Sequence, residues 1–159
     1  MTRPLTALLL AAGLAQPASA LSCLRPSVPQ TFAVASASEA SYVLAVGRIA
    51  LMPGEAIPST GDDPNAREGY TVRARLDGHL ASPTGFDAPA SFPLDVQVDC
   101  AGAWCGGVPL AERMLVFVER REDANVLVEG PCPFWAFKAS PEVVAEAEAC
   151  LRGEACTPG

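Results

Sequence analysis

Six cysteines are the residues of this chain best suited to chemistry: Cys23, Cys100, Cys105, Cys132, Cys150 and Cys156. Cysteines either bind zinc as thiolates or, in an oxidising compartment, join in pairs as disulfides. The spacings contain no C-x-x-C pair and the chain has a single histidine, so the pattern disfavours a zinc site. An even number of cysteines favours disulfides and argues against a free catalytic thiol.

Two pairs of cysteines are close in sequence, and each pair flanks a glycine that can turn the chain. Each pair could therefore close a short local loop, and the remaining two cysteines would then join segments that are far apart. Sequence alone does not choose among all the pairings that six cysteines allow. The local loops nevertheless favour one set: Cys100–Cys105, Cys150–Cys156 and Cys23–Cys132.

The single histidine, His79, is the other side chain that could take part in catalysis. A histidine can activate a serine or cysteine nucleophile, so a small extracytoplasmic hydrolase is one functional alternative. No nucleophile elbow, phosphate-binding loop or paired metal motif accompanies His79. A surface turn after Asp77-Gly78 is the favoured interpretation, and we predict that the chain is not an enzyme.

Three acidic residues, Asp62, Asp63 and Glu68, lie in a segment rich in proline and glycine. Carboxylates are the ligands that calcium prefers, but this spacing matches no EF-hand. We therefore predict a solvated acidic loop at this point, with no metal ion and no cofactor.

The N-terminal segment, residues 1–20, is typical of a secretory signal peptide. Arg3 gives the positive start, an apolar run follows, and small residues precede a cleavage site after Ala20. The run is too short to cross a bilayer, which takes about 20 residues. Cleavage after Ser22 also fits the small-residue rule, an uncleaved anchor is the alternative, and a lipid anchor on Cys23 is disfavoured. A periplasmic or secreted protein without a transmembrane segment is predicted.

Composition limits the class of protein and partner. A length of 159 residues fits one domain, and a chain that is 50% hydrophobic and 18% charged can form a core. The 11 basic residues stand against 18 acidic ones, which gives a net charge of −7. Nucleic-acid binding is disfavoured because phosphate neutralisation needs clustered cations.

Five segments have the composition of β-strands. In 70–76, for example, apolar and polar residues alternate with the period of two that a half-buried strand requires. Gly47 predicts a bulge or bend inside the first strand, and Asp77-Gly78 is expected to end or bend the second. The five predicted strands are 42–51, 70–76, 92–98, 113–119 and 125–129.

The C-terminal segment is predicted to be helical. Ser140 can cap a helix with Pro141 in its first turn that continues to about Leu151. By contrast, the segment 21–38 is predicted to be extended, with at most a single helical turn at 36–40.

These elements predict a mainly β fold, namely a five-stranded Greek-key barrel of the oligonucleotide/oligosaccharide-binding (OB) type with a C-terminal α-helix and disulfide staples. The predicted organisation is a signal peptide at 1–20, the barrel domain at 21–138, and a helix and tail packed on the barrel at 139–159.

The order and spacing of these pieces resemble the netrin-like module and, within it, bacterial relatives of the tissue inhibitors of metalloproteinases. The matching pieces are Cys23, the strand at 40–49, Tyr70-Thr71-Val72 followed by Gly78, Cys105-Gly106 before the strand at 113–117, and Cys132.

In those inhibitors the mature chain begins Cys-x-Cys, and the first cysteine chelates the zinc of the target protease through its amino group and carbonyl. The corresponding triplet here is Leu21-Ser22-Cys23, so the first cysteine is replaced. Cys23 matches the second cysteine of the family, and the resemblance implies that it pairs with Cys132.

The resemblance implies an exported protein-binding module whose partner is another extracytoplasmic protein. A narrower alternative is a metalloprotease inhibitor that acts through its N-terminal arm. For the aromatic residues, the favoured interpretation is that they close one end of the barrel, and an exposed ligand patch is the alternative. The candidate partner-binding residues are Leu21, Ser22, Cys23, Trp104, Phe134 and Trp135.

Overall fold

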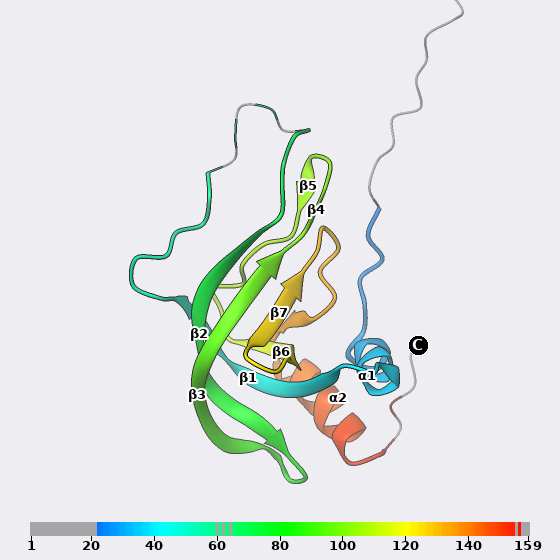
Figure 1. Ribbon diagram of the computed structural model, residues 1–159. Helices are drawn as coiled ribbons and strands as arrows, with labels where there is room; N and C mark the ends of the chain where they lie inside the picture. The colour runs from blue at the N-terminus through cyan, green and yellow to red at the C-terminus, as the bar shows by residue number, and fades with distance from the viewer. Residues whose placement is uncertain (1–21, 60, 62, 64, 155, 157–159) are drawn as a thin grey trace, which may run out of the picture.

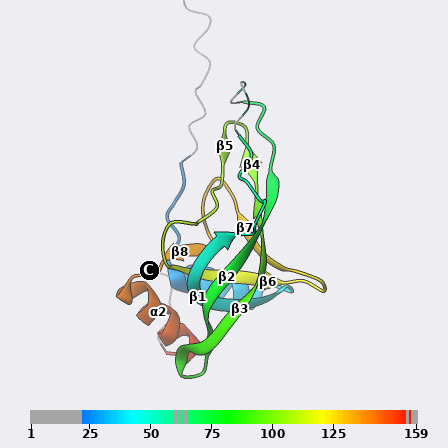
Figure 2. The same ribbon diagram turned by 90° about the vertical axis from the view of Figure 1, so that its left-hand side faces the viewer.

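The computed structural model of this protein describes residues 22–59, 61, 63, 65–154 and 156. Most of the described residues in regular structure belong to β-strands, and two helices pack beside them (Figures 1 and 2). In chain order the elements are α1 (Val28–Ala37), β1 (Ser41–Leu51), β2 (Tyr70–Ser82), β3 (Gly85–Val98), β4 (Cys100–Ala101), β5 (Trp104–Cys105), β6 (Met114–Arg120), β7 (Asn125–Glu129), β8 (Ala136–Lys138) and α2 (Pro141–Leu151).

Five strands form a continuous circuit of hydrogen-bonded pairs. The main sheet has six strands in the order β1-β2-β3-β7-β6-β8, and β6 pairs again with β1, which closes the circuit of the first five. The β3–β7 pair is parallel, and the other pairs in this circuit are antiparallel. The predicted fold class, a mainly β chain with a five-stranded OB-like barrel and a C-terminal helix, is confirmed.

The strands β2 and β3 are longer than the sequence pattern predicts, and both are strongly curved (Figure 1). Gly78 bends β2 rather than ending it, since it pairs with Gly47 of β1. A Cβ atom at Gly78 would lie 2.2 Å from the backbone oxygen of Val46. Only glycine allows the two backbones to approach so closely at the curve.

The apolar side chains form two clusters, one on each face of the curved sheet. The first fills the barrel with inward residues of all five strands, such as Leu76, Leu94 and Leu127. The second lies between the outer faces of β1 and β6 and the two helices, with Phe117 and Ala147 fully buried in it. The helices therefore cover the outside of the barrel and complete the core.

The prediction of an extended arm at 21–38 is wrong beyond residue 27, because α1 occupies most of that segment. Ser27 caps the helix by accepting a hydrogen bond from the amide of Gln30 at 3.3 Å. Val28 and Thr31 are buried, and the Thr31 hydroxyl donates to the carbonyl of Phe134 at 3.0 Å. This bond joins α1 to the segment before β8.

All three predicted disulfides are present. Cys23–Cys132 spans 109 residues, whereas Cys100–Cys105 and Cys150–Cys156 close loops of 5 and 6 residues. The long-range disulfide attaches the segment before α1 to the β7–β8 loop. The Cys150–Cys156 disulfide joins the end of α2 to the tail.

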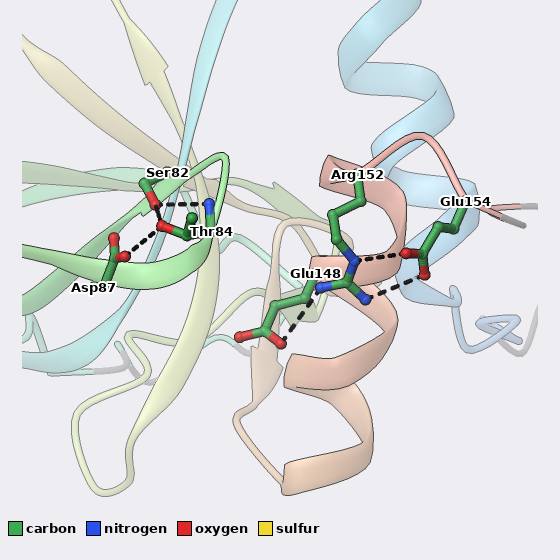
Figure 3. Close-up of polar contacts among 6 residues, drawn as sticks. All are labelled: Ser82, Thr84, Asp87, Glu148, Arg152 and Glu154. Atoms are coloured by element: carbon green, nitrogen blue, oxygen red, sulfur yellow. Dashed lines mark hydrogen bonds and ion pairs between the residues drawn. The ribbon is translucent and has the colours of Figure 1, made fainter.

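The predicted C-terminal helix is confirmed as α2, with Ser140 as its cap. The tip of the β2–β3 hairpin lies close to this helix, because a Cβ atom at Gly85 would be 2.9 Å from Oε1 of Glu148. Figure 3 shows Arg152 between Glu148 and Glu154 at the helix end, and a separate set of hydrogen bonds that links Ser82, Thr84 and Asp87 in the hairpin.

Candidate protein-interaction surface

The N-terminal arm is held against the barrel at its base. The Cys23–Cys132 disulfide fixes the arm beside the β7–β8 loop, while the next side chain, Leu24, is 93% exposed. Ser22 is also exposed, and Leu21 lies outside the described residues. An ordered backbone thus presents an apolar side chain to solvent.

A groove runs between this arm and the start of the C-terminal region. Its volume is about 650 Å³, and residues Cys23 to Val28 form one wall. β8 and the first turns of α2 form the other side, with Phe137 and Val143 among the apolar residues. Concave, mainly apolar surfaces with a few polar groups are typical binding sites.

Charged side chains stand along the same groove. Arg25 is exposed and forms no ion pair with any described residue. Lys138 is held by Glu112 at 2.8 Å, and Glu146 of α2 contributes a negative charge on the helix side. Exposed ion pairs such as Lys138–Glu112 contribute little stability.

A second projecting element is the β4–β5 hairpin, which carries Trp104. The Cys100–Cys105 disulfide joins its two strands, and Gly102 turns the chain with a φ of 59°. The Trp104 side chain is 54% exposed. The hairpin, the β7–β8 loop and the arm lie toward the same end of the molecule in both views (Figures 1 and 2). We call residues 22–26, 100–105 and 130–134 the interaction rim.

The other candidate aromatic residues are not part of a common patch with Trp104. Trp135 packs against both apolar clusters and stacks on Tyr42 with ring centroids 4.7 Å apart. Phe134 is half-buried and meets Trp135 edge to face at 5.0 Å. Trp135 therefore closes the core near the rim, as the favoured interpretation expects, and Trp104 is the aromatic residue left exposed.

One carboxyl group is buried at the same end of the barrel. Glu129 is only 2% exposed, and its Oε1 atom has no hydrogen-bond partner among the described residues. It pairs in register with Val98 of β3, a residue of the inner cluster, so its side chain enters the barrel. Burial raises the pKa of Glu129 to about 8, and the carboxyl is mostly protonated at neutral pH.

His79 does not occupy the predicted surface turn. It lies within β2, half-buried, and pairs with Val46 and Pro89. Within the described ranges, it makes no hydrogen bond to a serine or threonine hydroxyl, and no three histidine, cysteine or acidic residues are grouped to hold a metal ion. Asp62 lies outside the described residues, so the acidic loop is described only in part.

None of the helices in the described part of the chain is both long and apolar enough to span a membrane. No protein-family model, no curated protein and no solved structure matches this chain.

The sequence pattern missed three features of this surface. Leu24 carries no motif, and its exposure follows from the position of the arm. The strand β8 is only three residues long and lies just after two prolines. For Glu129 a signal was present, because the alternation in 125–129 places it on the same face as the buried Leu127.

Proposed function

We propose that this chain is an exported, non-catalytic protein-binding module of the netrin-like type, which engages another extracytoplasmic protein through the interaction rim. Three disulfides indicate an oxidising, extracytoplasmic compartment. The proposal includes release into the periplasm or out of the cell after removal of the predicted signal peptide.

The exposed Leu24 beside a disulfide supports this function above all other features. An isolated exposed leucine is common, but here the neighbouring backbone is fixed by Cys23–Cys132 and borders an apolar groove. Fixing a binding segment in advance lowers the entropy lost on association. Trp104 supplies a second anchor of the kind that dominates binding energy at protein interfaces.

Substitutions at the two anchors test the proposal. We expect Leu24→Asp and Trp104→Ser each to reduce capture of a partner from the native extracytoplasmic fraction by at least about tenfold, as for residues at an interface hot spot. Val34→Asp is the matched control, since Val34 is 45% exposed on α1 and belongs to none of the three segments of the rim. Quantitative mass spectrometry of the captured proteins measures the effect, and circular dichroism checks that the variants fold. Partner capture that is equal in all four proteins would exclude the rim.

A second candidate function is inhibition of a zinc protease by the arm. The Cys23–Cys132 disulfide supports it, because the disulfide holds the segment that follows the predicted cleavage site. If cleavage follows Ala20, the new α-amino group lies two residues before Cys23 and could coordinate the zinc of a protease. This function predicts that the mature chain begins at Leu21, or at Cys23 if cleavage follows Ser22.

Acetylation of the α-amino group distinguishes protein binding through the rim from inhibition of a zinc protease. Lys138 is the only lysine in the chain, so the mature Lys138→Arg variant carries a single amine. We expect acetylation of that variant to abolish inhibition of zinc proteases while partner capture through Leu24 and Trp104 persists. A protein that inhibits equally well after acetylation, or a mature N-terminus upstream of Leu21, would contradict inhibition by the amino group.

A further inference from the structure

β8 is hydrogen-bonded to β6 along one edge, and along the other edge it pairs with no strand of the described residues. It pairs with β6 through Leu115↔Phe137 and the neighbouring residues. The bonds from the Phe117 amide to the Trp135 carbonyl, and from the Ala139 amide to the Arg113 carbonyl, show which residues face β6. Backbone groups alternate in direction along an antiparallel strand, so the N–H and C=O of Ala136 and the N–H of Lys138 point away from β6.

The residues of β8 that carry these outward groups line the groove. Ala136, Phe137 and Lys138 all line it, and the arm forms the opposite wall. Ala136 makes no backbone hydrogen bond to the arm or to any other described segment outside the sheet. An edge strand with unpaired donors and acceptors is a template for a further strand, and here the template lies in a depression.

The charged residues of the groove limit which peptide could add to β8 as a further strand. Arg25 stands on the arm without an acidic partner among the described residues, and Lys138 marks the end of β8. Glu146 lines the groove from the α2 side, and Lys138 is already paired with Glu112, which leaves Arg25 as the unpaired cation of this lining among the described residues. A segment with a carboxylate near Arg25 and apolar side chains toward Phe137 and Val143 matches the lining.

We propose that the groove between the arm and β8 binds an extended peptide segment of the partner protein, which adds to the free edge of β8 as a new strand and carries an acidic side chain to Arg25. This inference rests on the proposed function and names how the partner is held. In strand addition the main-chain hydrogen bonds give affinity, and side-chain pockets give specificity.

The test uses the full mature protein and a phage-displayed library of random ten-residue peptides. Selected peptides are resynthesised, and amide hydrogen exchange is followed by NMR with and without saturating peptide. We expect exchange at Ala136 and Lys138 to slow by about tenfold or more, as newly bonded amides do. The Phe137 amide already faces β6 and is the internal control, so its exchange should stay unchanged. Failure to select any peptide, or peptides that leave Ala136 unprotected, would overturn the inference.

Two substitutions at one position give an independent readout. Ala136→Pro removes the outward N–H and spares the ladder to β6, since proline is tolerated where an edge-strand N–H faces outward. Ala136→Ser keeps the N–H. We expect proline to weaken peptide binding by at least about tenfold and serine to leave it unchanged. Equal affinity in both variants contradicts strand addition, and the NMR measurement decides the question if the proline variant does not fold.

The same variants distinguish this inference from the proposed function. Partner capture that is lost in Leu24→Asp but retained in Ala136→Pro would keep the protein-binding function and reject strand addition. Selected peptides that bind the edge, together with no partner dependent on Leu24, would reject the function and keep the peptide site. A dimer of the chain alone that disappears in Ala136→Pro would assign the edge to a second copy and overturn the inference.

Discussion

Replacing both Cys23 and Cys132 with alanine will lower the free energy of unfolding more than the loss of either other disulfide. The bond closes a loop of 109 residues, and constraint of the unfolded chain by a loop of that length contributes about 4–5 kcal/mol in the chain-entropy model. Because a small domain is stable by only about 5–15 kcal/mol, the variant should be close to unfolding at physiological temperature. Urea denaturation measures the change.

The matched control is the double alanine variant of Cys150 and Cys156. Its disulfide closes a loop of only 6 residues, for which the same model gives about 2 kcal/mol. The two variants should therefore differ by about 2–3 kcal/mol in unfolding free energy. Equal destabilisation would mean that the long-range disulfide does not constrain the unfolded chain as proposed. Because the Cys23–Cys132 variant also frees the arm, any folded fraction should capture less partner.

Stability will also fall as pH rises from about 4.5 to about 8, through the buried carboxyl group of Glu129. Burial raises the pKa of Glu129 from 4.5 to about 8, so between these values the folded protein holds a proton that the unfolded chain releases. Stability therefore decreases with pH at up to about 1.4 kcal/mol per unit. Below pH 4.5 the carboxyl is protonated in both states, and above pH 8 it is ionised in both, so its contribution is constant there.

Glu129→Gln tests this origin of the pH dependence. The amide has nearly the shape of the protonated acid and does not ionise, so the decline between pH 4.5 and 8 should become shallower and the variant should be more stable than the wild type at pH 8. Glu122→Gln is the control, since Glu122 is exposed in the β6–β7 turn. Denaturant midpoints measured across this range give the slope. A decline of unchanged steepness in Glu129→Gln would show that the carboxyl is hydrated in solution.

The strands were predictable because local alternation determines which face of a strand is buried. Val72, Ala74 and Leu76 read as one face in the sequence and line the barrel interior in the structure. The extension of β2 past Gly78 was not predictable in the same way. A glycine next to an aspartate usually marks a turn, and only the approach of Gly47 on the neighbouring strand explains why this one lies inside a strand.

The sequence of α1 contains a helical pattern that two nearby prolines made hard to recognise. Val28, Thr31, Phe32 and Ala35 lie on one face at helical spacing, and Ser27 precedes them as a cap. The prolines near this segment suggested an extended arm, although Pro29 lies in the first turn, where its missing amide costs nothing. The local sequence was thus compatible with an extended arm and with a helix. Burial against Phe117 and α2 favours the helix.

The candidate site was only partly predictable from sequence, because exposure is a property of the assembled fold. Trp104 and Trp135 are the same residue type, and each lies near a cysteine, Trp104 directly before Cys105 and Trp135 three residues after Cys132. Trp104 projects from a two-strand hairpin, whereas Trp135 stacks on Tyr42. The free edge of β8 depends on pairing with β6 across the molecule, which no pattern within three residues can show.

The order of the cysteines along the chain has a consequence for biosynthesis. Cys23 pairs with Cys132 across the Cys100–Cys105 pair, so one disulfide is nested inside the other. If the chain enters the oxidising compartment from its N-terminus, the next thiol to emerge after Cys23 is Cys100, and oxidation in order of emergence would join the wrong partners. Correct pairing then requires that Cys23 wait as a thiol or that the first bond be exchanged. Maturation should therefore depend on a disulfide isomerase as well as on an oxidant.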